Sequence, residues 1–254
     1  MILSMFQRGM ESLERQYGVD SLARVRKLLS VDASASCTER HVAQRTARYI
    51  LPGLPTGPWL DIPQYVELNE GCGALQAHHA EIKKEALARV AKAPPDLYDT
   101  YLDKPNPKWR SIYLKKGGVD DETLAGDFPV TRMLVERHFR NQLYPLGEVF
   151  FSALMPGAHI VTHSDMTNFF ICLHFGVSVP QECTLRVANE TRTFAENQVY
   201  LFDHSFEHEA WNRSGEMRIN LLFDVWHPEV TLVEREALAF CFRKLRDLMD
   251  EVSQ

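Results

Sequence analysis

The chain has 254 residues, of which 45% are hydrophobic and 24% are charged, a balance typical of a soluble globular protein with a substantial core. Its formal net charge of −6 gives no electrostatic support to nucleic-acid binding. No apolar run approaches the ~20 residues that span a bilayer, so we expect no membrane span.

The N-terminus and the cysteines indicate the compartment. The first residues are only briefly apolar and lack the basic start and cleavage site of a signal peptide, so we expect a cytoplasmic location. The cysteines are odd in number, scattered and without a C-x-x-C pair, so we expect reduced thiols and no structural zinc site. They are Cys37, Cys72, Cys172, Cys183 and Cys241.

The first expected element is an amphipathic helix over residues 10–30, within an N-terminal helical extension that we assign to residues 1–50. Asp20 can cap a segment whose apolar residues share one face. These residues are Leu22, Val25, Leu28 and Leu29. The helix either packs on the rest of the chain or forms a homodimer contact, and the sequence does not choose between the two.

Two segments are expected to lack regular structure. Four prolines between Leu51 and Pro63 predict an extended connector, which opens a main domain that we assign to residues 51–230. Tyr98–Lys116 is rich in aromatic residues and lysine. This second segment either shapes the entrance of a binding site or packs as a loop on the core.

Two further helices are expected before the core. The first covers residues 75–93, where Ile82, Ala86 and Val90 recur four positions apart. His78 and His79 near its start point about 100° apart on a helix, so we interpret them as surface residues and not as a metal pair. The second covers residues 121–143, which Pro129 can break in two. Its apolar candidates are Leu124, Met133, Leu134 and Phe139.

Short alternating strands dominate the rest of the chain. They are expected at residues 148–155, 158–163, 168–175, 183–188, 198–203, 207–212 and 217–226. Many short strands without intervening helices indicate a mainly β protein with flanking helices, whose core, residues 147–228, is an antiparallel sandwich or barrel of the jelly-roll type. Residues 231–254 return to a helical pattern, and we expect this helix to cover the outside of a sheet. Its apolar face contains Leu238, Phe242, Leu245 and Met249.

Three residues of this core have the chemistry of a metal site. His163 and Asp165 form an H-x-D motif, and residues two apart on an extended segment point to the same face. His208 follows after two further strand-like runs that can fold it back beside the pair. Two histidines and one carboxylate are the ligand set of non-haem Fe(II) that activates O2. The alternative is that each side chain only satisfies a hydrogen bond in a β-rich core.

Arg218 distinguishes these possibilities, because it lies on an otherwise nearly apolar strand. A charge there is costly to bury unless an anion meets it. A planar guanidinium can bind a carboxylate through two parallel hydrogen bonds. The carboxylate that we expect is the distal end of 2-oxoglutarate.

These residues and others in the same order resemble the aspartyl/asparaginyl β-hydroxylase family of Fe(II)/2-oxoglutarate-dependent oxygenases. The resemblance covers roughly residues 51–231 and is dense from Gly147 onward. It is carried by Gly53–Trp59, Pro156-Gly157, His163, Thr167-Asn168, His174, Ala188–Thr193, Phe202-Asp203, Ser205–Glu209, Arg218 and Asp224–Glu229.

The resemblance implies a double-stranded β-helix, cupin-like core and a dioxygenase reaction with Fe(II), 2-oxoglutarate and O2. It supports metal binding by His163 and His208, and Asp165 is a third ligand of a kind that some members of the family keep; together with Arg218 these residues form the expected catalytic set. Co-substrate binding falls to Arg218, supported by two residues. Ser152 precedes His163 by eleven positions, as a family serine does, and His174 matches a family histidine near the co-substrate. From spacing alone, Ser152 and His174 could equally be ordinary strand residues.

Three departures from the vertebrate members bear on the reaction. Asp165 stands where those members have glycine, and a carboxylate there favours hydroxylation over halogenation, because it occupies the position that chloride would take. Phe170 and Cys172 stand where those members have arginines. An apolar ring cannot pair with an acidic side chain, so we expect a small, amino-acid-like substrate, free or bound to a carrier or peptide.

Alternative functions remain open from the sequence alone. The same oxygenase could act on a peptidyl Asp or Asn residue, or catalyse desaturation or cyclisation. A metal-dependent cupin-like hydrolase or isomerase would not need Arg218. A non-catalytic binding module that has kept the fold is the third possibility.

Overall fold

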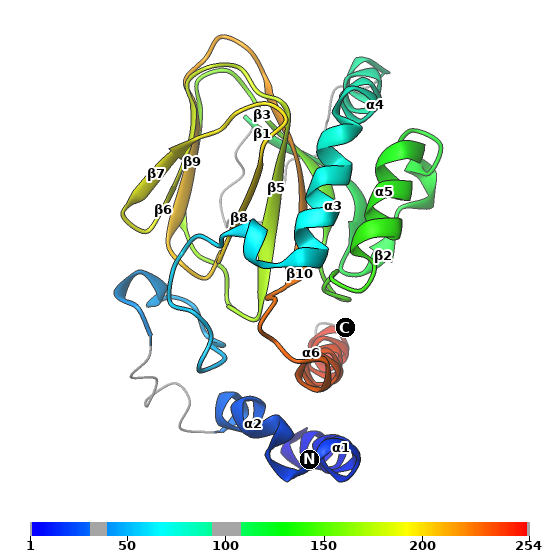
Figure 1. Cartoon of the computed structure of the whole chain (residues 1–254), viewed down its shortest axis with the longest axis vertical. Coiled ribbons are helices and arrows are strands. Elements are labelled where there is room, and N and C mark those ends of the chain that lie inside the picture. The colour runs from blue at the N-terminus through cyan, green and yellow to red at the C-terminus, as the bar shows by residue number, and fades with distance from the viewer. Residues whose placement is uncertain (1, 31–39, 93–107, 253–254) are drawn as a thin grey trace.

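The computed structural model describes residues 2–30, 40–92 and 108–252. Within them, ten strands form two antiparallel sheets that face each other (Figure 1). In spatial order the larger sheet contains β2 (Val119–Asp120), β1 (Trp109–Lys116), β3 (Val149–Leu154), β10 (Arg218–Trp226), β5 (Phe170–Ser178) and β8 (Val199–Phe202). The smaller sheet contains β4 (Ala158–His163), β9 (His208–Asn212), β6 (Cys183–Val187) and β7 (Glu190–Thr193). The expected jelly-roll core with flanking helices is confirmed.

The larger sheet is covered on its outer face by α3 (Val66–Ala77), α4 (His79–Lys92) and α5 (Pro129–Phe139) (Figure 1). Outward-facing residues of β10 and β5, such as Leu221 and Phe175, join these helices in the main hydrophobic core. The inner face of the same sheet looks toward the smaller sheet. Strand alternation therefore separates an apolar, helix-covered layer from the interior of the barrel.

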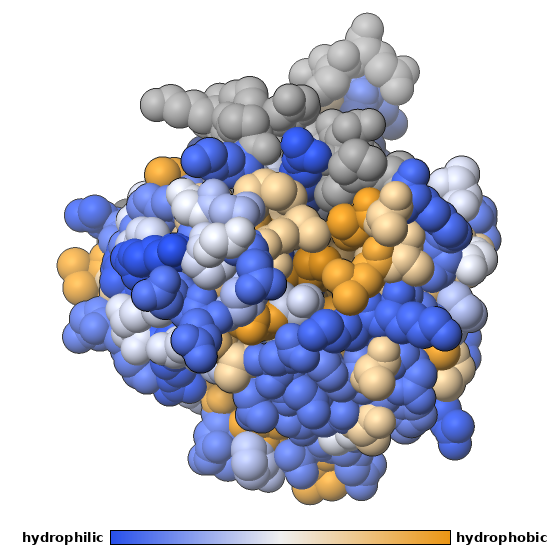
Figure 2. All heavy atoms as spheres, turned by 90° about the horizontal axis from the view of Figure 1, so that it is seen from above, coloured by the Kyte–Doolittle hydropathy of each residue, from blue (hydrophilic) through white to orange (hydrophobic). Residues whose placement is uncertain are grey.

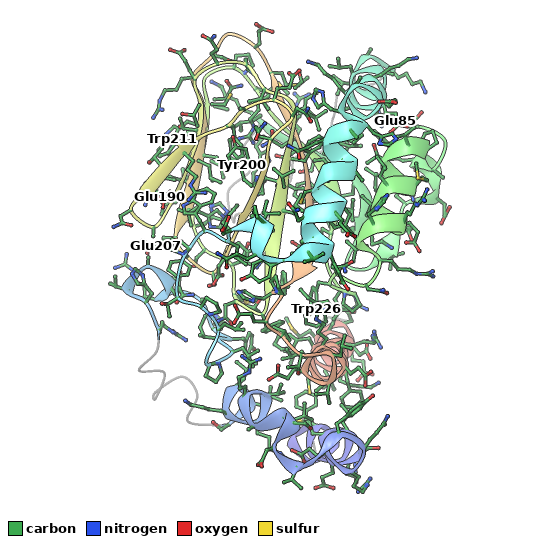
Figure 3. All side chains as sticks on the ribbon, in the orientation of Figure 1. Glu85, Glu190, Tyr200, Glu207, Trp211 and Trp226 are labelled. Carbon is green, nitrogen blue, oxygen red and sulfur yellow. The ribbon has the colours of Figure 1, made fainter. Side chains whose placement is uncertain are left out.

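Glu85 links α4 to α5 through hydrogen bonds (Figure 3). From α4 its carboxylate accepts hydrogen bonds from the backbone N–H groups of Val130 (2.7 Å) and Thr131 (3.0 Å), at the start of α5. An anion there satisfies N–H groups that have no partner inside the helix and opposes the positive end of its dipole. Pro129 begins this helix at its first position, where a missing N–H costs nothing.

The N-terminal helices α1 (Ile2–Tyr17) and α2 (Ala23–Leu29) pack with α6 (Leu232–Val252) at one end of the barrel (Figure 1). Arg24 of α2 forms a salt bridge with Glu234 of α6, with Nε–Oε1 and Nη2–Oε2 distances of 2.8 and 2.6 Å. Trp226, at the end of β10, lies where the sheet meets α6 (Figure 3). The first helices therefore pack within the chain.

Several expectations about the helices were wrong in detail. The helix expected over residues 10–30 is broken at Gly18, whose φ of 106° is a left-handed conformation, and Asp20 lies in a short turn instead of capping a helix. Helix α6 packs on α1 and α2 instead of covering a sheet. The helix expected over residues 75–93 is two helices that meet at His78. His79 is half-buried, because its Nε2 hydrogen-bonds to the carbonyl of Val177 (2.9 Å).

The strand predictions were closer, with two corrections, and one helix residue also departs from its expectation. Trp109–Lys116 forms β1 of the larger sheet instead of an irregular segment, and residues 98–107 lie outside the described part of the chain. Strand β7 was not expected. Met133, an apolar candidate of the third helix, is 44% exposed.

The described cysteines, Cys72, Cys172, Cys183 and Cys241, are free, as expected, and all four are buried; Cys37 lies outside the described residues. Among the described helices, none combines the length and apolarity that a bilayer crossing requires. Figure 2 shows one face of the molecule, where a group of apolar side chains is surrounded by hydrophilic ones.

Candidate functional site

A cavity between the two sheets contains every residue that the sequence indicated for the site. The space between its walls, open mouth included, is about 720 Å3. The six residues come from five strands and one loop of the two sheets. They are Ser152, His163, Asp165, His174, His208 and Arg218. The fold therefore brings them together, while their functions stay predictions.

His163 and His208 are held as a matched pair. They are direct partners in the pairing of β4 with β9, and their ring centroids are 4.1 Å apart. In each ring Nδ1 hydrogen-bonds at 2.8 Å to the backbone carbonyl two residues earlier, of Val161 and Phe206 respectively. A carbonyl only accepts, so Nδ1 carries the proton and Nε2 keeps the free lone pair. Both rings therefore have the tautomer that can bind a metal through Nε2.

Burial keeps His208 neutral. The pKa of His208 is held well below its usual value, mainly because the ring is buried away from water and secondly because His163 lies beside it. A neutral imidazole is the form that binds metal ions. The backbone carbonyls fix the ring orientation in the way that outer hydrogen bonds do in metalloproteins.

Asp165 is near the histidines, but its carboxylate is turned to another group. Its backbone N–H donates to the carbonyl of His204 (2.9 Å), and its Oδ2 lies 3.4 Å from Nδ1 of that histidine. Among the described residues, no three His, Cys, Asp or Glu side chains are close enough together to hold a metal ion. The structure therefore places the two histidines directly opposite each other, while the Asp165 carboxylate beside them faces His204 and does not complete a set of three ligands.

Arg218 is the most unusual residue of the cavity. It is 1% exposed, and its Nε and Nη1 have no hydrogen-bond partner. Burial lowers the pKa of its guanidinium to about 10, a value at which it is still charged at neutral pH. A buried cation with unsatisfied donors is strongly unfavourable unless an anion binds there. The cavity therefore fits a carboxylate ligand at this position.

Ser152 and His174 line the same cavity near Arg218. The Ser152 hydroxyl accepts a hydrogen bond from Nε1 of Trp109 (2.9 Å), which fixes its position on β3. His174 stacks on Phe194 at 5.8 Å, and its Nδ1 has no partner. Burial, followed by the charge of Arg218, lowers the pKa of His174 well below its usual value. Both side chains can therefore offer neutral hydrogen bonds to an anion.

Sequence reasoning missed several polar residues of the barrel interior. Asn220 is fully buried, with neither side-chain polar atom paired, while His204, Glu148 and Asp224 line the cavity. The alternation of β10 was the available signal, because Asn220 and Asp224 share a face with Arg218. No sequence signal pointed to Glu148 or His204.

The donor set fits Fe(II) and 2-oxoglutarate. Two imidazoles whose Nδ1 atoms are held by backbone carbonyls, with an adjacent carboxylate, are the ligand types that non-haem Fe(II) takes. The unsatisfied guanidinium of Arg218 suits the distal carboxylate of the co-substrate. Asp165 can join the histidines only if its side chain turns from His204.

Comparisons with known proteins agree with the sequence resemblance. The family model described as aspartyl/asparaginyl beta-hydroxylase matches residues 76–228. Proteins named aspartyl/asparaginyl beta-hydroxylase from Mus musculus and Homo sapiens are each 33% identical over 196 residues, 75% of this chain and 26% and 25% of the relatives. Human aspartate beta-hydroxylase domain-containing protein 2 is 26% identical over 251 residues, covering 92% of this chain and 64% of that protein. The chain thus spans about a quarter of the length of the first two.

Solved structures match more weakly. A cupin 2 conserved barrel domain protein from Salinispora arenicola covers 52% of this chain and 85% of its own, with a TM-score of 0.31 and 11% identity. A likeness at this level carries no argument about function, and the fold assignment depends on the strand order and pairing.

Proposed function

The chain belongs to the aspartyl/asparaginyl β-hydroxylase family, and we propose that it is an Fe(II)- and 2-oxoglutarate-dependent dioxygenase that hydroxylates an unactivated C–H bond of an amino-acid residue or an amino-acid-derived molecule. The observation that carries this proposal is the buried, unsatisfied guanidinium of Arg218 in one cavity with the paired histidines. A hydrolase or isomerase of the same fold has no need of that charge.

In this proposal Nε2 of His163 and His208 would hold Fe(II), with Asp165 as the third ligand. Arg218 would bind the distal carboxylate of 2-oxoglutarate, with Ser152 and His174 beside it. The chemistry that Fe(II) and 2-oxoglutarate supply when bound is the O2-dependent decarboxylation to succinate and CO2, coupled to hydroxylation.

The chain's own residues supply orientation, charge and exclusion of water. The carbonyls of Val161 and Phe206 hold the two histidines in one tautomer and orientation. The Arg218 guanidinium neutralises an anion inside the barrel, where a low dielectric strengthens the interaction. The walls of the two sheets would hold the reacting C–H bond in a fixed place, and such positioning contributes to the rate.

The substrate is less constrained. The names of the relatives specify aspartyl and asparaginyl residues, which favours a residue within a peptide over the free or carrier-bound amino acid expected from the sequence. We keep both the peptide residue and the free or carrier-bound amino acid as candidates, because Phe170 and Cys172 stand where vertebrate members carry arginines. Desaturation or cyclisation would proceed from the same site.

The proposal is tested by loading the protein with Fe(II) and 2-oxoglutarate without O2, then adding air and a panel of amino acids and peptides while succinate is measured. Substrate-stimulated succinate is expected. Substrate turnover at a rate that does not depend on 2-oxoglutarate would favour the hydrolase or isomerase. An Asp165→Ala variant with unchanged iron affinity and turnover would show that this carboxylate is not a ligand.

A further inference from the structure

The segment from His41 to Leu51, which we call the strap, lies against the two stretches of chain that adjoin the paired histidines. One stretch is residues 164–168, which follow His163, and the other is residues 203–207, which precede His208. The strap itself does not line the cavity. It therefore contacts the site from outside, and the proposed function gives it no role.

A buried side chain of the strap holds the stretch before His208. Gln44 is 4% exposed, and its Nε2 donates hydrogen bonds to the Ser205 hydroxyl (2.7 Å) and to Oδ2 of Asp203 (3.3 Å). Its Oε1 accepts a hydrogen bond from the backbone N–H of His41 (3.1 Å), at the start of the short turn Val42–Gln44. One amide group therefore ties the turn of the strap to a buried part of the barrel.

A single peptide unit connects the strap to the His208 ring. The backbone N–H of Glu207, which lies beside the strap (Figure 3), donates to the carbonyl of Ala43 (2.6 Å). The carbonyl of the same peptide unit, that of Phe206, is hydrogen-bonded to Nδ1 of His208 (2.8 Å). Hydrogen bonds in a chain polarise one another, so the contact with Ala43 strengthens the acceptor that orients the imidazole. The strap thus acts on His208 without contacting its ring.

A second group of contacts holds the stretch after His163. The carbonyl of Met166 accepts hydrogen bonds from two consecutive backbone N–H groups of the strap, at 2.9 and 2.7 Å. The hydroxyl groups of Thr46 and Ser164 are hydrogen-bonded to each other. Ser164 lies between His163 and Asp165 in the sequence, so this contact reaches the centre of the H-x-D motif.

The far end of the strap is fixed by Asn168, which is 4% exposed. Its side-chain amide accepts a hydrogen bond from the backbone N–H of Leu51 (2.7 Å) and donates one to the carbonyl of the same residue (3.1 Å). The strap precedes residues 76–228, which the family model matches. A segment outside that match therefore joins the two stretches that adjoin the proposed ligands.

We propose that the strap belongs to the metal site and that Gln44 is a positioning residue. By holding residues 203–207 it fixes the Phe206–Glu207 peptide, and this peptide sets the tautomer and orientation of His208. The strap then raises the affinity of the site for a divalent metal without providing a ligand, as outer hydrogen bonds do in metalloproteins. This inference rests on the proposed function, because it takes His163 and His208 to be metal ligands.

Metal affinity separates a positioning role from a general role in folding. Gln44→Met keeps the length of the side chain and removes its hydrogen bonds. Gln142→Met is the matched control, because Gln142 is also buried and its side chain hydrogen-bonds to Glu67, outside the cavity lining. Both variants should lower the melting temperature. Only Gln44→Met should weaken Fe(II) binding to the full chain, by about tenfold or more, in a calorimetric titration without O2.

The His208 tautomer in the metal-free protein is a second measurement, which a loss of stability alone does not change. Long-range proton–nitrogen NMR correlations of the histidine rings should show the proton on Nδ1 in the wild type and in Gln142→Met. In Gln44→Met we expect both tautomers of His208, because the Phe206 carbonyl is no longer held in place.

Thr46→Val is the variant that decides if Gln44→Met does not fold. Thr46 is exposed, and valine has nearly the same shape without the hydroxyl that contacts Ser164. This variant should fold as the wild type does and should bind Fe(II) about threefold more weakly, through the loss of one hydrogen bond beside His163. Unchanged affinity in Thr46→Val would then overturn the inference.

The outcomes separate this inference from the proposed function. Unchanged Fe(II) affinity or an unchanged His208 tautomer in Gln44→Met overturns the positioning role. An equal loss of affinity in Gln142→Met does the same, because affinity would then follow stability alone. If the wild-type chain binds no Fe(II), or binds it equally well after His208→Ala, the proposed function fails and this inference fails with it.

Discussion

The two faces of β10 contrast sharply in what they contact. Outward, Ile219, Leu221 and Phe223 are at most 1% exposed and pack under the helices. Inward, the same strand presents Arg218 and Asp224 to the cavity. One face provides hydrophobic stabilisation and the other places charge where it is costly without a ligand. Stability and binding can therefore be changed separately by substitutions one residue apart.

The largest expected effect comes from Arg218→Met. Turnover with 2-oxoglutarate should fall about a thousandfold, because the distal carboxylate loses its buried partner. The melting temperature should stay the same or rise, because an apolar side chain replaces an unsatisfied buried charge. Succinate assays and thermal melts measure the two. Arg213→Met, at an exposed arginine outside the cavity, is the control. A loss of stability in Arg218→Met would contradict the separation of binding and stability between the two faces of β10.

Phe223→Ala should have the opposite effect to Arg218→Met, lowering stability and leaving 2-oxoglutarate binding unchanged. Phe223 is fully buried and lies edge-to-face with Phe139 of α5, with centroids 4.8 Å apart. The unfolding free energy should fall by about 3–5 kcal/mol through lost burial and a cavity. Urea denaturation measures this loss. The affinity of the folded fraction for 2-oxoglutarate should not change, and a large change would mean that the two faces are coupled.

A smaller effect is expected from pH through His227, which is 2% exposed and outside the cavity lining. Burial, followed by Arg24 and Arg235, lowers its pKa to about 4. The unfolded chain therefore takes up this proton first, and stability is lost as the pH falls from the ordinary histidine value toward 4. The group contributes on the order of 3 kcal/mol above that window. His227→Asn keeps an acceptor for the Glu229 N–H and should reduce the acid slope of unfolding free energy. An unchanged slope would contradict this.

The smallest expected effect concerns the helical layer alone. Glu85→Gln weakens the acceptor at the start of α5 and should cost about 1 kcal/mol. Glu81→Gln, an exposed residue in the first turn of α4, is the matched control for charge. Chemical denaturation measures both. Equal effects would show that the link between α4 and α5 contributes nothing beyond surface charge.

The sequence predicted the barrel better than its surroundings, for physical reasons. Strands with one buried face alternate visibly, as in Cys183–Val187. Glu190–Thr193 is exposed at every residue and has no such pattern. The nearness of Glu148 and Asp224 could not be foreseen either, since the hydrogen bond from the Glu148 backbone N–H to the Asp224 carboxylate joins residues 76 apart in the sequence. The six site residues were identified through motifs and family resemblance, while the rotation of the Asp165 side chain depends on His204.

The most direct test of the account is a calorimetric titration of 2-oxoglutarate, without O2, into protein loaded with Fe(II). We predict one site per chain whose affinity depends on the metal and is lost in both His208→Ala and Arg218→Met. Binding that persists in both variants, or that does not depend on Fe(II), would contradict the assignment of this cavity.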